Sequence, residues 1–303
     1  MPDIWTIREA LEWTIAYLDK KGDANPRLSA QWLMSFATRL ERLGIYANYD
    51  KPLSLEERSV LRDAVSRRAL HEPLQYITGE VGFRYLTLKV AKNVLIPRPE
   101  TEVLVSEALK CLPKPSKLEQ ADSEQELPSA SLLVADICTG SACIACSIAK
   151  EHPDTFVYAT DISPDAIALA RENVDALELN DRVAVLEGNL GSPIPEDLLG
   201  LFDVVVSNPP YIPHGLLEEL DHEVKDFEPM LALDGGNDGL DLFRELLLWA
   251  KMALKNNGAL CVELHEESLC DARELALAAG FSKVTVVEDL AHRPRVLVAR
   301  YVL

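Results

Sequence analysis

The feature that most constrains the fold is an alternation of short apolar runs with helical periodicity from Leu132 onward. Such alternation predicts a doubly wound α/β sheet with helices on both faces. The last two apolar runs have no helix between them, which predicts an antiparallel hairpin at the sheet edge. The expected strands are Leu132 to Ile137, Thr155 to Thr160, Arg182 to Leu186, Phe202 to Ser207, Ala259 to Leu264, Lys283 to Val287 and Val296 to Val302.

The first 72 residues predict a separate helical domain. Apolar residues recur with helical spacing from Ile7 to Leu18, and Ser54-Leu55-Glu56-Glu57 is a capping-box pattern that opens a helix. This part shows no chemistry of its own, so we expect it to dock a substrate or to be structural. A β-hairpin linker is expected over 73–99, the main domain over 100–303, and an exposed acidic loop over 112–131. We expect Trp5, Trp13, Trp32 and Trp249 in the core.

Charge and cysteine content narrow the class of partner and compartment. The formal net charge of -19 is a poor match for the phosphates of DNA or RNA, so no direct nucleic-acid binding is expected. The six cysteines follow no signal peptide, which predicts free thiols and a cytoplasmic protein. No apolar run approaches the ~20 residues needed to span a membrane. We also expect the protein to be a monomer.

Three loops follow neighbouring expected strands, where ligands bind in open α/β sheets. The turn from Asp136 to Ala142 has small side chains and leads into a helix, whose amino end favours an anion. Asp161 ends the next strand and suits the two hydroxyls of a ribose. Asn189, between Gly188 and Leu190, offers a polar side chain that reads an adenine edge. Each signal is weak alone, and their order along the chain makes them specific.

The fourth strand leads into Asn208-Pro209-Pro210-Tyr211. The two prolines lack backbone donors and cannot continue a sheet ladder, so they form a stiff turn. This turn presents an amide and an aromatic ring at the ligand-binding edge. A plain structural turn is the alternative when the motif is considered alone.

The whole series resembles class I methyltransferases that use S-adenosylmethionine, and more closely the HemK/PrmC family of protein-(glutamine-N5) methyltransferases acting on peptide chain release factors. The resemblance covers nearly the whole chain. It rests on the helical N-terminal domain, on the stretch Ile96-Pro97-Arg98-Pro99-Glu100-Thr101-Glu102, on Asp136 to Ala142, on Asp161, and on Asn208 to Tyr211. It also includes Leu231 to Leu240, Glu288 to Ala291 and Arg293 to Val296.

The resemblance implies transfer of a methyl group from S-adenosylmethionine to the side-chain nitrogen of the glutamine in the Gly-Gly-Gln motif of release factors. It implies that the Asn208 side-chain oxygen and the Pro209 carbonyl accept the two N–H bonds of the substrate, while Tyr211 packs on the amide. The implied cofactor-binding residues are Asp136, Cys138, Thr139, Gly140, Ser141, Ala142, Asp161, Asn189, Leu190 and Asn208. The implied substrate-binding residues are Arg98, Pro99, Glu100 and Thr101, together with Asn208, Pro209, Pro210 and Tyr211.

Two departures from the family pattern stand out. Cys138 and Ala142 replace the first and last glycines of the usual cofactor loop, so we expect reduced room there. Leu264 and His265 follow Glu263 where the family commonly has a glycine. This second departure leaves the local backbone open.

Several alternatives remain at this point. The rival activities are glutamine methylation of a ribosomal protein, N6-adenine methylation of nucleic acid, and an inactive methyltransferase fold that only binds a partner. Cys143-x-x-Cys146 and the pair His214 and His222 are weak metal candidates, and no metal is expected. The acids from Glu218 to Glu223 predict a solvated face or a contact for a basic partner.

Overall fold

The computed structural model describes residues 5–115 and 132–302, so most of the acidic stretch expected over 112–131 lies outside the described residues. The chain divides into two compact units. The first comprises Met1–Glu80 together with Asp221–Phe227, and the second comprises Val81–Leu220 and Glu228–Leu303. In the described ranges, no helix has both the length and the apolar character needed to cross a bilayer.

The first unit is helical, as its sequence predicts. Capping boxes open two of its helices. The Thr6 and Ser54 hydroxyls accept from the backbone N–H groups of Glu9 and Glu57, and the carboxylates of these glutamates accept from the backbone N–H groups of Thr6 and Ser54. Its helices are α1 (Ile7–Lys20), α2 (Pro26–Thr38), α3 (Arg42–Ala47), α4 (Leu55–Arg68), α5 (Leu74–Thr78) and α9 (His222–Lys225). Their apolar faces meet in one core.

Two tryptophans expected in the core are on the surface instead. Helix α2 buries a stripe that includes Ala30, Leu33 and Met34, which leaves Trp32 40% exposed on another face. Trp13 is 49% exposed and stacks on Tyr17 with ring centroids 4.9 Å apart. The buried face of α2 is therefore formed by other residues, and the two tryptophan rings remain partly exposed.

A buried arginine joins distant parts of the first unit. Arg68 at the end of α4 donates to Asp23 and to Glu223, each over 2.6 Å. Because Arg68 is only 6% exposed, both carboxylates act as its counter-charges. Glu223 was expected on a solvated face or against a basic partner; its side chain is 39% exposed, and it pairs with an arginine of the same chain.

The second unit holds the sheet. Its helices are α6 (Thr101–Cys111), α7 (Cys143–Glu151), α8 (Pro164–Ala176), α10 (Asp241–Ala253) and α11 (Leu269–Ala278). Its strands are β1 (Glu80–Phe83), β2 (Leu86–Lys89), β3 (Leu132–Ile137), β4 (Thr155–Asp161), β5 (Val183–Glu187), β6 (Phe202–Ser207), β7 (Leu254–Glu263), β8 (Phe281–Glu288) and β9 (Pro294–Tyr301). Short 3₁₀ turns occupy Glu196–Leu198, His214–Glu219, Met230–Ala232 and Glu266–Ser268.

The seven-stranded sheet has the order β5-β4-β3-β6-β7-β9-β8. The strands from β5 to β7 are parallel, and β9 pairs antiparallel with both β7 and β8. The chain runs outward from β3 to β5, then returns to β6 on the other side of β3, which creates a switch point between β3 and β6. This is the expected class I methyltransferase-like doubly wound sheet with a C-terminal hairpin.

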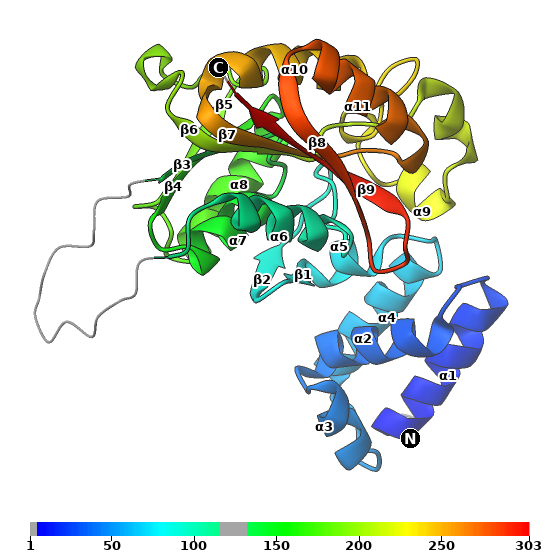
Figure 1. Cartoon of the computed structure of the whole chain (residues 1–303). Coiled ribbons are helices and arrows are strands. Elements are labelled where there is room, and N and C mark those ends of the chain that lie inside the picture. The colour runs from blue at the N-terminus through cyan, green and yellow to red at the C-terminus, as the bar shows by residue number, and fades with distance from the viewer. Residues whose placement is uncertain (1–4, 116–131, 303) are drawn as a thin grey trace, which may run out of the picture. The chain divides into compact units, whose positions relative to one another are not determined.

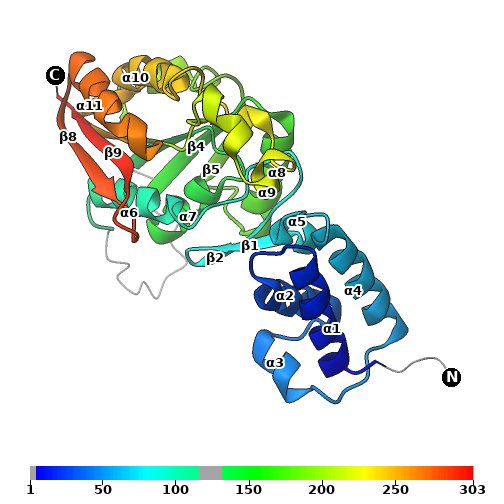
Figure 2. The same cartoon turned by 90° about the vertical axis from the view of Figure 1, so that its right-hand side faces the viewer.

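Successive residues of the central strands point to opposite faces of the sheet. Val134, Val204 and Val206 contribute to the core under α6, α7 and α8, whereas Ala135 and Val205 contribute to the core under α10 and α11. Figures 1 and 2 show these two helical layers on either side of the sheet. The separate two-stranded hairpin of β1 and β2 adds apolar residues to the first of these cores.

Candidate functional site

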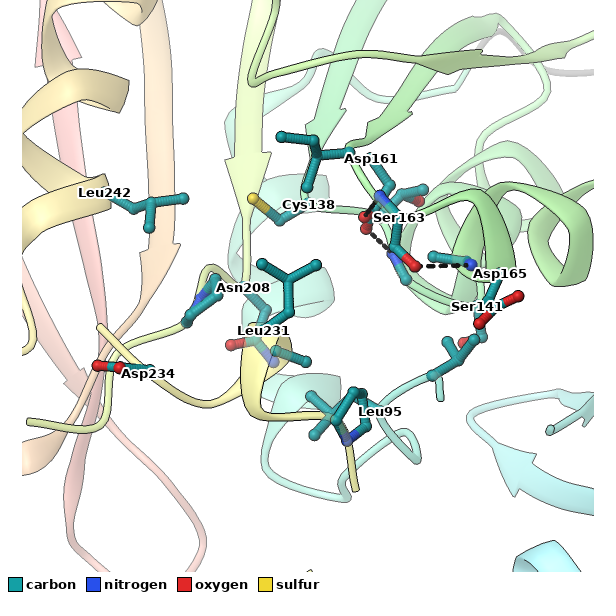
Figure 3. A pocket seen from close by; sticks show the side chains of 18 of the residues that line it. Leu95, Cys138, Ser141, Asp161, Ser163, Asp165, Asn208, Leu231, Asp234 and Leu242 are labelled. Atoms are coloured by element: carbon teal, nitrogen blue, oxygen red, sulfur yellow. Dashed lines mark hydrogen bonds between the residues drawn. The ribbon is translucent and has the colours of Figure 1, made fainter. Parts of the chain in front are cut away.

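The expected ligand loops start from strand ends that lie in register. Ile137 at the end of β3 pairs with Thr160 of β4 on one side and with Ser207 of β6 on the other. The Ser207 hydroxyl also donates to the Ile137 carbonyl over 2.6 Å. The residues that follow, among them Cys138 and Asn208, therefore emerge side by side at one edge, as Figure 3 shows.

These loops surround a cavity of about 840 Å³. All of its lining residues belong to the second unit. The lining includes ten of the residues expected from sequence, namely Arg98, Thr101, Cys138, Thr139, Gly140, Ser141, Asp161, Asn189, Asn208 and Pro210.

The other expected residues lie behind the cavity wall or beside it. Leu190 and Tyr211 pack against the core under α10 and α11. Glu100 forms an ion pair with Arg293 over 3.4 Å. The expected residues that do not line the cavity are Asp136, Ala142, Leu190, Pro99, Glu100, Pro209 and Tyr211.

The turn after β3 has a backbone that explains why glycines are usual there. Cys138, Gly140 and Ala142 all have positive φ, at 61°, 56° and 62°. Left-handed backbone costs a residue with a side chain about 1–2 kcal/mol, so the turn keeps its shape at some strain where Cys138 and Ala142 replace glycine. The expected effect of these residues on cofactor space remains a prediction.

Buried polar groups fix this turn from below. Asp136 is fully buried and accepts from the Thr139 hydroxyl over 2.6 Å and from the Ala145 backbone over 3.1 Å. Burial raises the pKa of Asp136 to about 7, against the lowering effect of these two bonds. Buried Asn173 of α8 donates to the Ser141 carbonyl over 3.0 Å. Asp136 therefore supports the turn rather than forming the cavity surface.

Asp161 at the tip of β4 is organised by backbone donors. Its two oxygens accept from the N–H groups of Gly140 and Ser163, each over 2.9 Å. Burial nevertheless raises its pKa. Each oxygen keeps a further lone pair, so the carboxylate can still accept hydroxyl groups from a ligand in the cavity.

The two polar atoms of the Asn208 side chain, Nδ2 and Oδ1, differ in their hydrogen bonding. Its Nδ2 donates to the Thr101 hydroxyl over 3.3 Å, while Oδ1 is buried and has no hydrogen-bond partner among the described residues. The side chain lines the cavity (Figure 3). A buried unpartnered acceptor is costly, so Oδ1 marks a place where an N–H or O–H donor would bind.

The turn with Tyr211 is held by the glycine-rich segment that precedes α10. A Cβ added at Gly235 would lie 2.7 Å from the Tyr211 Cα, and one at Gly239 would lie 2.3 Å from the Tyr211 carbonyl oxygen. Gly239 also has a φ of +76°. Only glycine allows the two chain segments to approach this closely. The Tyr211 hydroxyl donates to buried Glu263 over 3.3 Å.

The Pro-Arg-Pro-Glu stretch is attached near the same cavity. Buried Glu228 forms an ion pair with Arg98 and accepts from the backbone of Ile96 over 3.3 Å. Glu228 follows the Asp221–Phe227 segment and was not singled out from sequence. No local pattern could have found it, because its partners lie more than a hundred residues earlier in the chain.

Apolar residues complete the cavity wall and were missed by the sequence analysis. Ile162, Met230 and Leu231 are 53%, 47% and 60% exposed, although their side chains are large and apolar. Their exposure could not be read from the sequence, where the only signal is a large apolar residue in a loop. Other lining residues that were not expected include Leu95, Ser163, Asp165, Asp234, Asp241 and Glu245.

The weak metal candidates have other partners or surroundings. Cys143 and Cys146 are buried on α7, where burial raises the pKa of each thiol. His214 contacts Asp234 and His222 contacts Asp226, at 2.9 Å and 3.0 Å. Across residues 5–115 and 132–302, no cluster of three or more metal-ligating side chains occurs.

The charges of the cavity fit the expected cofactor. Five carboxylate residues line it, and Arg98 is the one lysine or arginine among the described lining residues. S-adenosylmethionine carries a positive sulfonium and a positive ammonium group, which an acid-lined cavity attracts. Asp161, Asn189 and the turn from Cys138 to Ser141 are the residues that would hold its ribose, adenine and amino-acid parts.

Known families and structures match both units. The family model described as the PrmC N-terminal domain matches residues 9–79, and that of the methyltransferase small domain matches residues 124–222. The catalytic domain of hMettl16 in complex with the MAT2A 3'UTR hairpin 6 has a TM-score of 0.54 at 15% identity, covering 81% of each chain. At this identity the likeness concerns the fold alone.

Curated relatives extend over almost the whole chain. The release factor glutamine methyltransferase of Geobacter sulfurreducens is 45% identical over 87% of this chain and 85% of its own. The protein of the same name from Chlorobaculum tepidum is 38% identical over 95% of this chain and 96% of its own. This chain belongs to the family of release factor glutamine methyltransferases.

Proposed function

We propose that this protein transfers a methyl group from S-adenosylmethionine to the side-chain nitrogen of the glutamine in the Gly-Gly-Gln motif of peptide chain release factors. One observation carries the proposal: Asn208 lines an acid-lined cavity, and its buried Oδ1 has no hydrogen-bond partner in the part of the chain that the structure describes. An acceptor in that position suits an –NH2 group, which has two N–H bonds to place.

The reaction needs alignment more than proton transfer. The nitrogen of a primary amide is a poor nucleophile because its lone pair is delocalised into the carbonyl group. Asn208 Oδ1 and the Pro209 carbonyl would accept the two N–H bonds and turn the lone pair toward the methyl group. Alignment of this kind contributes up to about 7–11 kcal/mol to a barrier reduction. When bound, the cofactor supplies an activated methyl group on a positive sulfur.

Tyr211 and the prolines would serve the same alignment. The hydrogen bond from the Tyr211 hydroxyl to Glu263 limits how the ring can turn. Pro210 lines the cavity, and Pro209 is buried behind it. We assign to Tyr211 packing against the flat amide of the substrate, and to the two prolines the rigidity of the turn.

Binding of the cofactor is assigned to the neighbouring loops. Asp161 would accept the ribose hydroxyls, and Asn189 would contact the adenine. The turn from Cys138 to Ser141 would admit the amino-acid part close to the backbone, with Asp136 and Ala142 supporting it from inside. Leu190 lies next to Asn189 and would act through packing.

Docking of the release factor is assigned to two regions. The stretch Arg98, Pro99, Glu100 and Thr101 would contact the segment around the glutamine. The helical part over 1–72 would bind the body of the substrate, joined through the hairpin region over 73–99 to the catalytic part over 100–303. The negative net charge of -19 favours a protein with basic surface over a nucleic acid.

The protein would act as a monomer in the cytoplasm, where release factors work. Light scattering of the purified protein tests this directly. A stable dimer whose dissociation abolishes activity would contradict it.

A single labelling experiment tests the substrate assignment. The purified protein is incubated with S-adenosylmethionine labelled in its methyl group and one of four acceptors: a release factor, its Gln→Ala variant, ribosomal protein or DNA. We expect label on the release factor alone, and none on the variant. Label on ribosomal protein or DNA would support the rival activities, and no label on any acceptor would support a binding-only role.

A further inference from the structure

Glu263 is a buried acid beside the turn that contains Asn208. The proposed mechanism gives Glu263 no role in orienting the Asn208 side chain. Glu263 is the last residue of β7, and the preceding Val262 pairs with Ser207 of the neighbouring parallel strand. The register therefore places Glu263 next to Asn208. Glu263 is 1% exposed, and no donor in the described ranges meets its Oε2 at full hydrogen-bonding geometry.

Thr101 stands between Glu263 and Asn208. Its hydroxyl accepts from Asn208 Nδ2 over 3.3 Å, and it lies close enough to the Glu263 carboxyl to lower the pKa of that group. Thr101 is 1% exposed, so water does not compete for the hydroxyl.

The hydrogen count of Thr101 decides the direction of each bond. A hydroxyl has one proton to donate and two lone pairs with which to accept. If the proton is directed to an ionised Glu263, only lone pairs remain to face Asn208. The Asn208 amide must then turn its NH2 group toward Thr101, and this leaves Oδ1 free on the other side.

We propose that ionised Glu263, acting through the Thr101 hydroxyl, is a positioning residue that fixes the Asn208 amide with Oδ1 directed to the substrate. The inference rests on the proposed function, because it explains how the acceptor for the glutamine –NH2 is kept in place. With Glu263 neutral, its own O–H becomes a donor to Thr101. The Thr101 proton is then free to face Asn208, and the amide can turn its NH2 toward the substrate, where it repels.

The groups around Glu263 place its ionisation within the pH range of enzyme assays. Arg295 of β9 favours the ionised form, and Glu100 before α6 opposes it. The Tyr211 hydroxyl donates to Glu263, and the charge of Glu263 is one of the causes that raise the pKa of the Cys143 thiol on α7. Burial has the largest effect and raises the pKa of Glu263 to about 7.

The first test compares turnover of wild-type protein with the variants Glu263→Gln, Thr101→Val and Thr101→Ser on a release factor. We expect Glu263→Gln and Thr101→Val to lower kcat on the order of ten- to a hundredfold, with the Kd for S-adenosylmethionine unchanged. Thr101→Ser keeps the hydroxyl and should recover most of the loss seen with valine. The double variant should lose no more than either single variant, because both changes break the same chain of bonds.

The pH profile supplies a readout that a merely structural role would not change. Wild-type kcat should rise with pH through a midpoint near 7, and Glu263→Gln should lack this step. Unchanged kcat and an unchanged profile in Glu263→Gln would overturn the proposal. Circular dichroism and thermal melts of each variant separate a folding defect from a positioning defect.

The second test needs no substrate and remains informative if the proposed function fails. In the free wild-type protein, the NMR resonances of the Asn208 side-chain NH2 should shift with a midpoint near pH 7. They are assigned by comparison with Asn208→Ala. The shift should vanish in Glu263→Gln and in Thr101→Val. Absence of the shift in folded wild-type protein overturns the positioning role, whereas absence of methyl transfer by wild-type protein overturns the proposed function.

Discussion

The Asn208 Nδ2 atom donates to the Thr101 hydroxyl over 3.3 Å, while the Oδ1 atom of the same amide is buried without a partner among the described residues. The two residues come from different parts of the chain, one at the first turn of α6 and the other just after β6. Their contact gives the Asn208 side chain a defined orientation. The first prediction follows from this arrangement.

Replacing Asn208 by alanine should abolish methyl transfer and leave cofactor binding nearly unchanged. The substitution removes the acceptor assigned to the substrate –NH2, whereas Asp161 and the turn after β3 remain in place. Turnover is measured with labelled S-adenosylmethionine, and cofactor affinity by calorimetry. Near-normal turnover in Asn208→Ala would show that the acceptor lies elsewhere.

Replacing Glu263 by glutamine should stabilise the protein at alkaline pH. An unfolded chain loses the Glu263 proton near pH 4.5, whereas burial keeps it in the folded state until about pH 7. The folded state thus binds more protons between these values, and the free energy of unfolding falls as pH rises. At about 1.4 kcal/mol per pH unit, we expect Glu263→Gln to gain about 1–3 kcal/mol over wild type between pH 4 and pH 8.

Urea denaturation of both proteins at these two pH values gives the comparison. Wild-type protein is the control, because Asp136 has a similarly raised pKa in both chains and cancels in the difference. A difference in stability that does not change with pH would mean that Glu263 is not buried in the way described.

Replacing Arg68 by methionine should destabilise the helical unit strongly. Methionine keeps much of the side-chain volume but leaves Asp23, which is 9% exposed, without its counter-charge. Removing one partner of a buried ion pair costs about 3–5 kcal/mol. Arg8→Met is the matched control, since the Arg8 and Asp50 side chains are 50% and 89% exposed and their pair contributes little. Equal unfolding free energies for the two variants would contradict the prediction.

Replacing Gly191 by alanine should disturb the packing of Trp249. The added Cβ would lie 1.9 Å from the indole ring, so the ring or the loop must move. Overpacking of this kind costs about 1–3 kcal/mol. Gly215→Ala is the control, because nothing lies within 4 Å of its added Cβ and alanine restricts the unfolded chain. Thermal unfolding should therefore show a lower midpoint only for Gly191→Ala.

Much of the sheet could be predicted because its strands are short, apolar and separated by helical patterns. The positions of Asp161 and Asn208 at one edge followed from the same reasoning, since parallel strands bring their carboxyl ends together. Strand boundaries were less certain. Strand β7 begins at Leu254 rather than at the expected Ala259. The extra residues pair irregularly with β6, because the register shifts between Phe202 and Val204.

The parts that could not be predicted depend on contacts between distant residues. Glu263 has no local pattern that links it to Tyr211, which lies 52 residues earlier. Glu228 likewise meets Arg98 only in the folded chain. The exposure of Trp32 was mispredicted for another reason, because the hydrophobicity of a residue alone does not say whether it lies on the face of α2 that packs against other helices.

The segment Asp221–Phe227 belongs to the helical unit, although the residues on both sides of it belong to the sheet unit. The polypeptide therefore crosses between the two units three times. Truncation after Glu80 would not excise a self-contained module, because Glu223 would lose Arg68 and a short loop would be left without its packing partners. Genetic exchange of the N-terminal part between relatives would have to carry this seven-residue loop along with it. Changes in the two pieces are thus expected to be inherited together, even though some 140 residues of sequence separate them.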